Sequence, residues 1–163
     1  MTRGFSAIGL VSPRKPENVG GVLRAAHCYG VSQVNISGAL PRSLSHPSNT
    51  PMAHRHTPTF IVTDVLEHIP QMTTIVAVDL VDGAISLTDF CHPERAIYVF
   101  GPENGTLGED TISRADVSVF IPTRSCMNLA SSVNVLLYDR LQKSGRAYDP
   151  YSMQETQILE ASQ

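Results

Sequence analysis

A carboxylate follows directly on an apolar run in the stretch Phe-Gly-Pro-Glu-Asn-Gly, residues 100–105. The four residues before it, 96–99, are apolar and β-rich, as expected of a buried strand. Ligands of an open parallel sheet bind beyond the carboxyl ends of its strands, so this position would deliver Glu103 to a binding site. Gly101 would let a ligand approach the backbone, and Pro102 would stop the strand ladder. The alternative is a tight turn that needs Gly and Pro and binds nothing.

Two other stretches carry polar and charged residues at the same kind of position. The first follows an amino-terminal strand and puts Asn18 and Arg24 on a loop-to-helix element. The second lies between the last strand and the last helix and contains Arg124 and Asn128. Arginine suits phosphate because its planar guanidinium presents a fork of N–H donors. Each residue also has an ordinary alternative role, as an exposed helix cation for Arg24 and as helix N-caps for the two asparagines.

Other common site chemistries have little support in the sequence. It contains neither the glycine-rich dinucleotide fingerprint nor a P-loop. His46, His54 and His56 offer an alternative reading as a metal site, since imidazole is a common zinc ligand. No cysteine or acid stands beside them at ligand spacing, however, so we predict no metal and expect these histidines at the surface.

The elements that must position these residues alternate between strand and helix patterns. A helix capped by Asn18 and ended by Gly30 has apolar residues at i, i+3, i+4 and i+7. Strands separated by helices indicate a parallel sheet that is covered on both faces. We expect strands at 5–11, 31–36, 59–62, 74–78, 96–100 and 117–121, and further helices at 63–69, 109–115 and 128–142.

Length and composition predict one domain. The chain has 163 residues, of which 42% are hydrophobic and 17% charged, enough to bury a core. We expect this domain at 1–150 and a polar tail at 151–163. No apolar stretch reaches the roughly 18 residues of a membrane span, and no signal-peptide layout is present, so we expect a cytoplasmic protein. The three cysteines lack Cys-x-x-Cys spacing and are expected to be reduced.

The net charge of −3 hides an asymmetry along the chain. Residues 1–60 carry six basic side chains and a single acid, whereas 61–123 carry ten acids and two arginines. Basic residues return at 124–146. If the two basic segments meet in space, they form a positive surface suited to a polyphosphate. A solvated surface with chance clustering is the alternative.

Three motifs together resemble the SpoU/TrmH family of the SPOUT superfamily, RNA ribose 2′-O-methyltransferases that use S-adenosyl-L-methionine. They are Asn-x-Gly-x-x-x-Arg from residue 18, Phe-Gly-Pro-Glu from residue 100, and Ile-Pro with Met-Asn-Leu ahead of a helix that contains Leu-Tyr-Asp. Each motif is weak alone, but their order and separation are specific. The resemblance covers residues 7–145 and is closest to the small members that lack an added RNA-binding domain, including those that modify tRNA.

The resemblance implies an α/β fold with a mostly parallel sheet, helices on both faces and a carboxyl-terminal trefoil knot. It also implies a homodimer whose active site draws on both chains, and an RNA substrate, with tRNA expected. The residues that match active-site positions are Asn18, Arg24, Glu103 and Asn128. The residues that match cofactor-binding positions are Asp79, Gly101, Ile121, Cys126 and Met127.

The sequence departs from the family pattern at three places. Cys126 stands where a serine is common, Thr106 where a glycine is common, and the loop 122–127 is shorter than usual. Two alternative functions are therefore a catalytically reduced RNA-binding module and a methyltransferase on another RNA or on a non-RNA substrate. Because a guanidinium hardly ever deprotonates in a protein, we expect Arg24 to clamp a phosphate rather than to act as a base.

Overall fold

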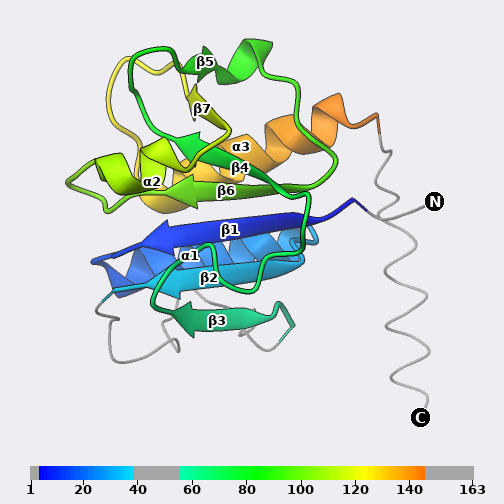
Figure 1. The fold of residues 1–163 in the computed structure, drawn as a ribbon, viewed down its shortest axis with the longest axis vertical. Coiled ribbons are helices and arrows are strands. Elements are labelled where there is room, and N and C mark those ends of the chain that lie inside the picture. Colours follow the sequence, from blue (N-terminus) through cyan, green and yellow to red (C-terminus); the bar gives the residue numbers. More distant parts are fainter. Residues whose placement is uncertain (1–3, 39–55, 146–163) are drawn as a thin grey trace.

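Seven parallel strands form one sheet at the centre of the molecule (Figure 1). The computed structural model describes residues 4–38 and 56–145. The sheet order is β3-β2-β1-β6-β4-β7-β5, and every neighbouring pair is parallel, which confirms the predicted sheet type. The strands are β1 Ser6–Val11, β2 Gln33–Ser37, β3 Thr59–Val62, β4 Thr74–Val78, β5 Ile85–Ser86, β6 Ala96–Phe100 and β7 Val117–Phe120.

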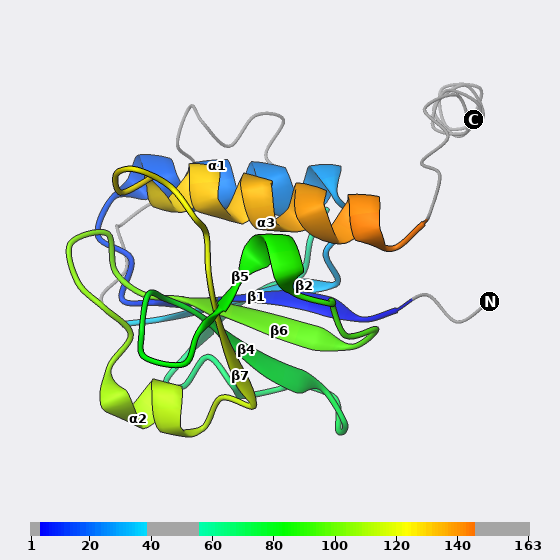
Figure 2. The same cartoon turned by 90° about the horizontal axis from the view of Figure 1, so that it is seen from above.

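Helices cover both faces of this sheet, as predicted. The two long helices, α1 Pro16–Cys28 and α3 Leu129–Lys143, lie side by side on one face, and the short α2 Glu109–Ser113 lies on the other (Figure 2). A 3-10 turn, η2 Leu87–Asp89, precedes β6. The knot implied by the resemblance stays a prediction, and the tail expected at 151–163 lies outside the described residues.

The strands bury side chains on both faces because successive residues of a strand point to opposite sides of the sheet. On β6, Tyr98 and Phe100 belong to the core beneath α1 and α3. Ile97 and Val99 belong to a second, smaller core on the face of α2. This burial on both sides explains why the central strands are continuous apolar runs without polar alternation.

The first helix begins earlier than predicted. Its first residue is Pro16, whose fixed φ suits the first helical position, and Lys15 is the N-cap without a side-chain cap hydrogen bond. Asn18 therefore lies inside the first turn, only 8% exposed, and its predicted role as N-cap is wrong. The end of the helix agrees with the sequence, because Gly30 follows Tyr29 at φ +66°.

The helix predicted at 63–69 is also wrong, since the chain forms turns there. The buried amide of Asn35 on β2 donates to the carbonyls of Val65 and Glu67, both at 2.8 Å. Asp64 Oδ1 accepts the N–H of Leu66 at 3.0 Å and forms a local side-chain turn. The Val65 carbonyl, which a helix would pair with the N–H of Ile69, is thus bound to Asn35 instead.

The last helix agrees with its prediction. Asn128 is its N-cap, with Oδ1 accepting the N–H of Ser131 at 2.7 Å. Its apolar face is buried at Leu129, Val133, Leu136 and Leu137. Close packing against α1 depends on Gly21, because a Cβ at that position would come within 2.7 Å of the Ala130 Cβ.

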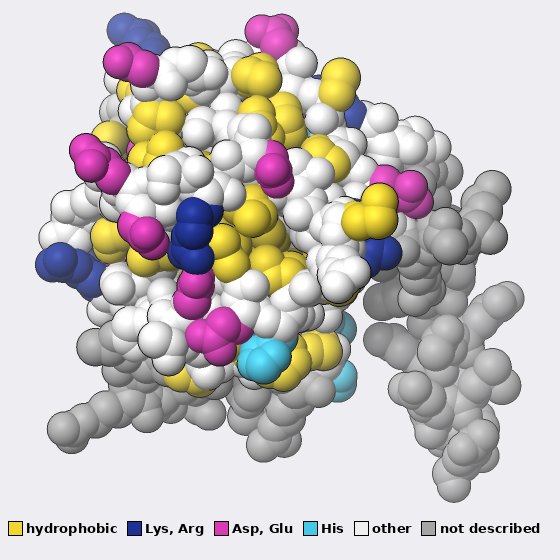
Figure 3. Space-filling view, viewed as in Figure 1, with side chains coloured by type: hydrophobic (Ala, Val, Ile, Leu, Met, Phe, Trp, Pro, Cys, Tyr) yellow, Lys and Arg dark blue, Asp and Glu magenta, His cyan; other side chains and the backbone are white. Residues whose placement is uncertain are grey.

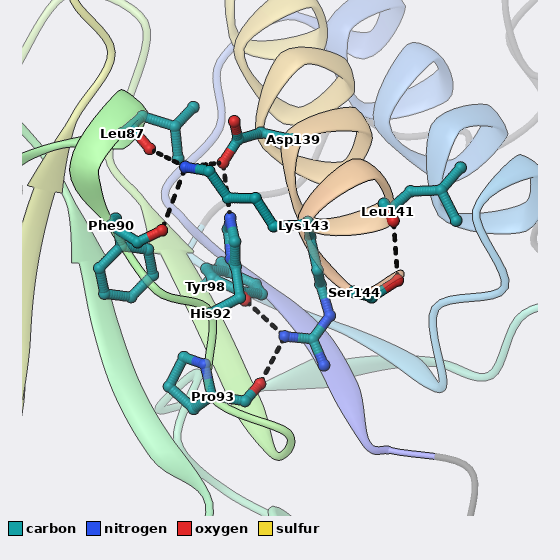
Figure 4. A network of polar contacts seen from close by, with 10 residues as sticks. Leu87, Phe90, His92, Pro93, Tyr98, Asp139, Leu141, Lys143 and Ser144 are labelled. Atoms are coloured by element: carbon teal, nitrogen blue, oxygen red, sulfur yellow. Dashed lines mark hydrogen bonds and ion pairs between the residues drawn. The ribbon is translucent and has the colours of Figure 1, made fainter. Parts of the chain in front are cut away.

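A polar network holds the chain before β6 against the end of α3 (Figure 4). The carboxylate of Asp139 can only accept, so His92 Nε2 carries the ring proton and donates to Asp139 Oδ2 at 2.9 Å. The lowered pKa of His92 keeps its ring neutral, so Nδ1 accepts from the Tyr98 hydroxyl at 2.7 Å, and that hydroxyl accepts from Arg140 at 2.8 Å. Asp139 also pairs with Lys143 at 2.8 Å. The network therefore contains a neutral histidine between a phenol and a carboxylate.

Candidate active site at the strand ends

Three loops at the carboxyl edge of the sheet enclose a pocket of about 490 Å³. They follow β4, β6 and β7, which are neighbours in the order β6-β4-β7, so the parallel topology brings the three loops together. The predicted cofactor residues all line this pocket, namely Asp79, Gly101, Ile121, Cys126 and Met127. Of the four predicted catalytic residues, Glu103 alone lines it.

The pocket has the size and the lining of a small-molecule site. Such sites are typically about 300–1,000 Å³, largely apolar and supplied with a few polar groups. Phe100, Phe120 and Leu129 contribute apolar side chains, and the loop backbones contribute polar groups. A nucleoside attached to an amino acid, the chemical type of S-adenosylmethionine, fits this combination of apolar walls and backbone donors and acceptors. The residues present are therefore compatible with the cofactor that the resemblance implies.

Gly101 is required by the shape of the loop itself. A Cβ at this position would lie 3.0 Å from the Leu107 nitrogen and 3.1 Å from the Thr106 carbonyl carbon. Such contacts are too close for backbone atoms that cannot move aside. The loop therefore folds back onto Gly101, and the glycine allows this approach as well as forming the pocket wall.

Glu103 and Asn18 form the best-defined polar contact among the predicted catalytic residues. Glu103 Oε1 accepts from Asn18 Nδ2 at 3.0 Å and from the Lys15 N–H at 3.1 Å, and Oε2 accepts from the Arg14 N–H at 2.8 Å. Partial burial raises the pKa of the Glu103 carboxyl, but these hydrogen bonds outweigh burial, and the net pKa is lowered. Glu103 is thus a carboxylate that accepts hydrogen bonds at the start of α1, where the helix dipole also favours negative charge.

Arg24 and Asn128 lie outside the pocket wall. Arg24 is exposed on α1 and makes no hydrogen bond or ion pair with the residues that the structure describes. Asn128 is exposed between Met127 and Leu129, which both line the pocket. The chain thus brings Asn18 and Glu103 together and puts Asn128 at the rim, and it leaves Arg24 facing solvent.

Several lining residues were missed by sequence reasoning. Leu80 and Phe120 line the pocket next to predicted cofactor positions, and their place at the ends of predicted strands could have indicated them. Ser132 lies one turn into α3, and nothing in its local sequence distinguishes it. Arg124, noted in the sequence for its charge, also lines the pocket and is exposed.

A metal site would need clustered ligands, and a membrane span would need a long apolar helix. Of the three loop histidines, His56 is described, and its ring lies 5.1 Å from that of His27. His46 and His54 lie outside the described residues. Within 4–38 and 56–145, no group of three or more His, Cys, Asp or Glu residues could hold a metal ion. None of the helices described is long and apolar enough to cross a membrane.

The described residues form no basic surface on one face of the molecule. On the face away from α1 and α3, isolated basic side chains alternate with acidic and apolar ones (Figure 3). There, Arg114 forms a two-pronged ion pair with Asp64 and a longer contact with Asp110. Other exposed cations lie on the loop before α1, on α1 and on the loop after β7: Arg14, Lys15, Arg24 and Arg124.

The fold is similar to those of solved methyltransferase structures. A structure of AviRb from Streptomyces viridochromogenes with bound AdoMet has a TM-score of 0.75 at 19% identity, covering 88% of this chain and 62% of that one. This likeness shows the fold. A structure concerning 2-OH methylation of C/U34 on tRNA has a TM-score of 0.74 at 26% identity, covering 89% of this chain and 100% of that one. A structure of an RNA 2′-O ribose methyltransferase has a TM-score of 0.74 at 26% identity, covering 88% of this chain and 58% of that one.

The chain thus spans about 62% of the length of AviRb but the whole of the tRNA-related structure. No curated protein matches it by sequence. The model of the SpoU rRNA Methylase family matches residues 6–138, which include the pocket and every predicted site residue. Since this match extends over most of its length, the chain belongs to the SpoU rRNA methylase family.

Proposed function

We propose that this protein is an S-adenosylmethionine-dependent RNA methyltransferase that modifies a ribose 2′-hydroxyl, with tRNA as the substrate. The observation that carries the proposal is that the predicted cofactor residues line one pocket of fitting size at three adjacent strand ends. Family membership supports it. The tRNA assignment rests on likeness to a structure concerned with tRNA methylation, a chain that is covered over its full length. Since RNA substrates are intracellular, we also propose the cytoplasm as its site of action.

The cofactor, when bound, supplies a methyl group on a positively charged sulfur. The backbone at Gly101, Ile121 and Met127 would hold it, and apolar side chains such as Leu129 would exclude water from it. A ribose hydroxyl is a weak nucleophile, so the remaining task of the protein is to align that hydroxyl and stabilise its developing negative charge.

Arg24 is the residue proposed for that task. Its guanidinium is exposed and has no partner among the described residues, so it is available to a phosphate of the substrate. Holding the phosphate next to the target ribose would fix the hydroxyl, and the positive charge would favour its loss of a proton. Asn18 and Glu103 would contribute indirectly, because their hydrogen bond fixes the start of the helix that carries Arg24.

In a homodimer, the pocket of one chain could be completed by residues of the other chain. On the outer face of α3, Val135 is 40% exposed and Tyr138 is 54% exposed, one turn apart. Exposed apolar side chains on a helix beside α1 support an interface through these two helices, with both chains contributing to each active site. Under this proposal Arg24, which does not line the pocket of its own chain, would serve the pocket of the partner.

Two measurements on one preparation test the proposal. Calorimetry with S-adenosylmethionine and S-adenosylhomocysteine, without metal, should give binding to both. Incubation with tRNA and S-adenosylmethionine, followed by mass spectrometry of the nucleosides, should give one new 2′-O-methylated residue. Absence of binding would favour an RNA-binding module without catalysis. Binding without methylation of any RNA would favour another methyl acceptor.

A further inference from the structure

The carboxylate of Asp79 joins two of the loops that form the pocket. Asp79 directly follows β4, and its backbone N–H donates to the Val119 carbonyl of β7 at 3.0 Å. Oδ1 accepts the N–H of Leu80 at 2.8 Å, and Oδ2 accepts the N–H of Leu107 at 2.8 Å. Both carboxylate oxygens are therefore already bound to backbone donors of the protein itself.

The contact with Leu107 determines where the wall of the pocket stands. Leu107 is 2% exposed, and its side chain packs in the core on the face of α2. Its nitrogen is the atom that a Cβ on Gly101 would meet at 3.0 Å, so the Leu107 backbone lies directly against the pocket wall. A buried N–H that loses its acceptor is costly, so removal of the Asp79 oxygen would favour movement of this backbone.

Little else holds this loop. Residues 101–107 form neither helix nor strand. Between the loop's own backbone groups the structure shows one hydrogen bond, from the Gly105 N–H to the Pro102 carbonyl at 3.2 Å. Glu103 fixes the loop to α1, and Asp79 fixes its far end to β4. Besides the buried Leu107 side chain, two carboxylates therefore hold this loop by hydrogen bonds, Glu103 and Asp79.

We propose that Asp79 is a positioning residue, which sets the pocket for the cofactor by holding the Leu107 backbone against Gly101. This inference rests on the proposed function of the pocket. It differs from the role that the family resemblance implies, in which Asp79 is itself part of the cofactor surface. Replacement by asparagine should be harmful under this proposal. An asparagine side chain has one acceptor oxygen in place of two, so its NH2 group, itself a donor, would face one of the two backbone N–H groups that Asp79 binds.

The test compares Asp79→Asn with Asp82→Asn, using S-adenosylhomocysteine as the probe. Asp82 is exposed on the same segment and makes no hydrogen bond or ion pair with the described residues, so it controls for loss of charge. Backbone NMR spectra without ligand report on the loop, through the amide signals of Gly101 and Leu107 and the exchange rate of the Leu107 amide. Calorimetry reports affinity, and steady-state kinetics at saturating cofactor report turnover.

For Asp79→Asn we expect a shift of the Gly101 and Leu107 signals, faster exchange of the Leu107 amide and about tenfold weaker binding, as for loss of one charge-assisted hydrogen bond. Turnover at saturating cofactor should change less than twofold, and Asp82→Asn should match the wild type throughout. Weaker binding with an unchanged loop would overturn the proposal in favour of direct contact. Unchanged binding by Asp79→Asn would also overturn it.

Two further results keep the test decisive. If Asp79→Asn does not fold, the wild-type protein still tests the inference, because an unprotected Leu107 amide would overturn it and strong protection would support it. If the wild type binds no S-adenosylhomocysteine, the proposed function fails. The positioning role of Asp79 is then tested by the NMR amide signals of Gly101 and Leu107 alone. Unchanged loop signals in Asp79→Asn would then overturn that role, and shifted signals would support it.

Discussion

The side-chain amide of Asn18 donates a hydrogen bond to Glu103 Oε1 at 3.0 Å, across 85 residues of sequence. This contact joins the first turn of α1 to the loop that follows β6. Because Glu103 lines the pocket and Asn18 lies on the same helix as Arg24, the pair connects the cofactor pocket to the proposed substrate clamp. Two residues predicted to be catalytic are therefore in contact, in an arrangement that suits positioning.

Glu103→Gln should destabilise the protein by about 1–2 kcal/mol at pH 7, because it removes charge from the hydrogen bonds accepted from Arg14, Lys15 and Asn18. The folded-state pKa of Glu103 is lowered, because the hydrogen bonds it accepts outweigh its burial. Its contribution is therefore complete above its ordinary pKa of 4.5 and is lost as the pH falls through the lower folded value. Urea unfolding across this range should show a steeper acid loss in the wild type than in Glu103→Gln, with Asp82→Asn behaving as the wild type. Parallel curves would contradict this role.

Tyr98→Phe should cost about 1–3 kcal/mol, because the partly buried partners Arg140 and His92 each lose a hydrogen bond. Burial, together with the positive charges of Arg140 and Lys143, lowers the pKa of His92 more than Asp139 raises it. The unfolded chain therefore takes up a proton near pH 6.5 before the folded protein does, and stability should fall as the pH drops below 6.5. Replacement of His92 by glutamine should flatten this slope in urea unfolding. An equal slope in both proteins would exclude His92 as its source.

Tyr138→Glu should weaken the proposed homodimer, since it places a charge on the outer apolar face of α3. The matched control is Ile61→Glu on β3, because both side chains are 54% exposed. Sedimentation at micromolar concentration should give a dimer for the wild type and the control, and a larger monomer fraction for Tyr138→Glu. A 17.7 kDa monomer for the wild type would contradict the proposed interface.

Arg24→Ala should lower turnover by about 100-fold to 1,000-fold, as expected for a lost contact to developing charge. Cofactor affinity should stay close to that of the wild type, because Arg24 does not line the pocket. Arg24→Lys should recover little activity, since an ammonium cannot reproduce the planar guanidinium. Arg95→Ala, which removes another exposed arginine, should keep full activity. Full activity in Arg24→Ala would return this residue to the role of a surface cation.

The sequence pattern predicted six of the seven strands and the loops that form the pocket. The apolar runs at β4, β6 and β7 predicted buried parallel strands, and the loops behind them lie together because the strands are neighbours. The cofactor residues came from the family resemblance, and they do line the pocket. Their individual roles stay predictions, because the pocket wall depends on contacts such as Asp79 to Leu107 that no local pattern encodes.

The failures have physical causes that lie outside the local sequence. The helix expected at 63–69 is replaced by turns, and Asn35 on a distant strand binds the Val65 carbonyl that such a helix would need. Asn18 resembles an N-cap, but Pro16 starts the helix two residues earlier and leaves the asparagine for Glu103. The two-residue strand β5 is too short to give a periodic signal, and its pairing with β7 creates it.

The most direct test of the proposed function is mass spectrometry of nucleosides from tRNA of a strain that lacks this gene. We predict the loss of one 2′-O-methylated nucleoside, its return when the wild-type gene is restored, and no return with Arg24→Ala. Retention of every 2′-O-methyl mark in the deletion strain, in tRNA and in other RNA, would contradict the proposal that this protein is an RNA ribose methyltransferase.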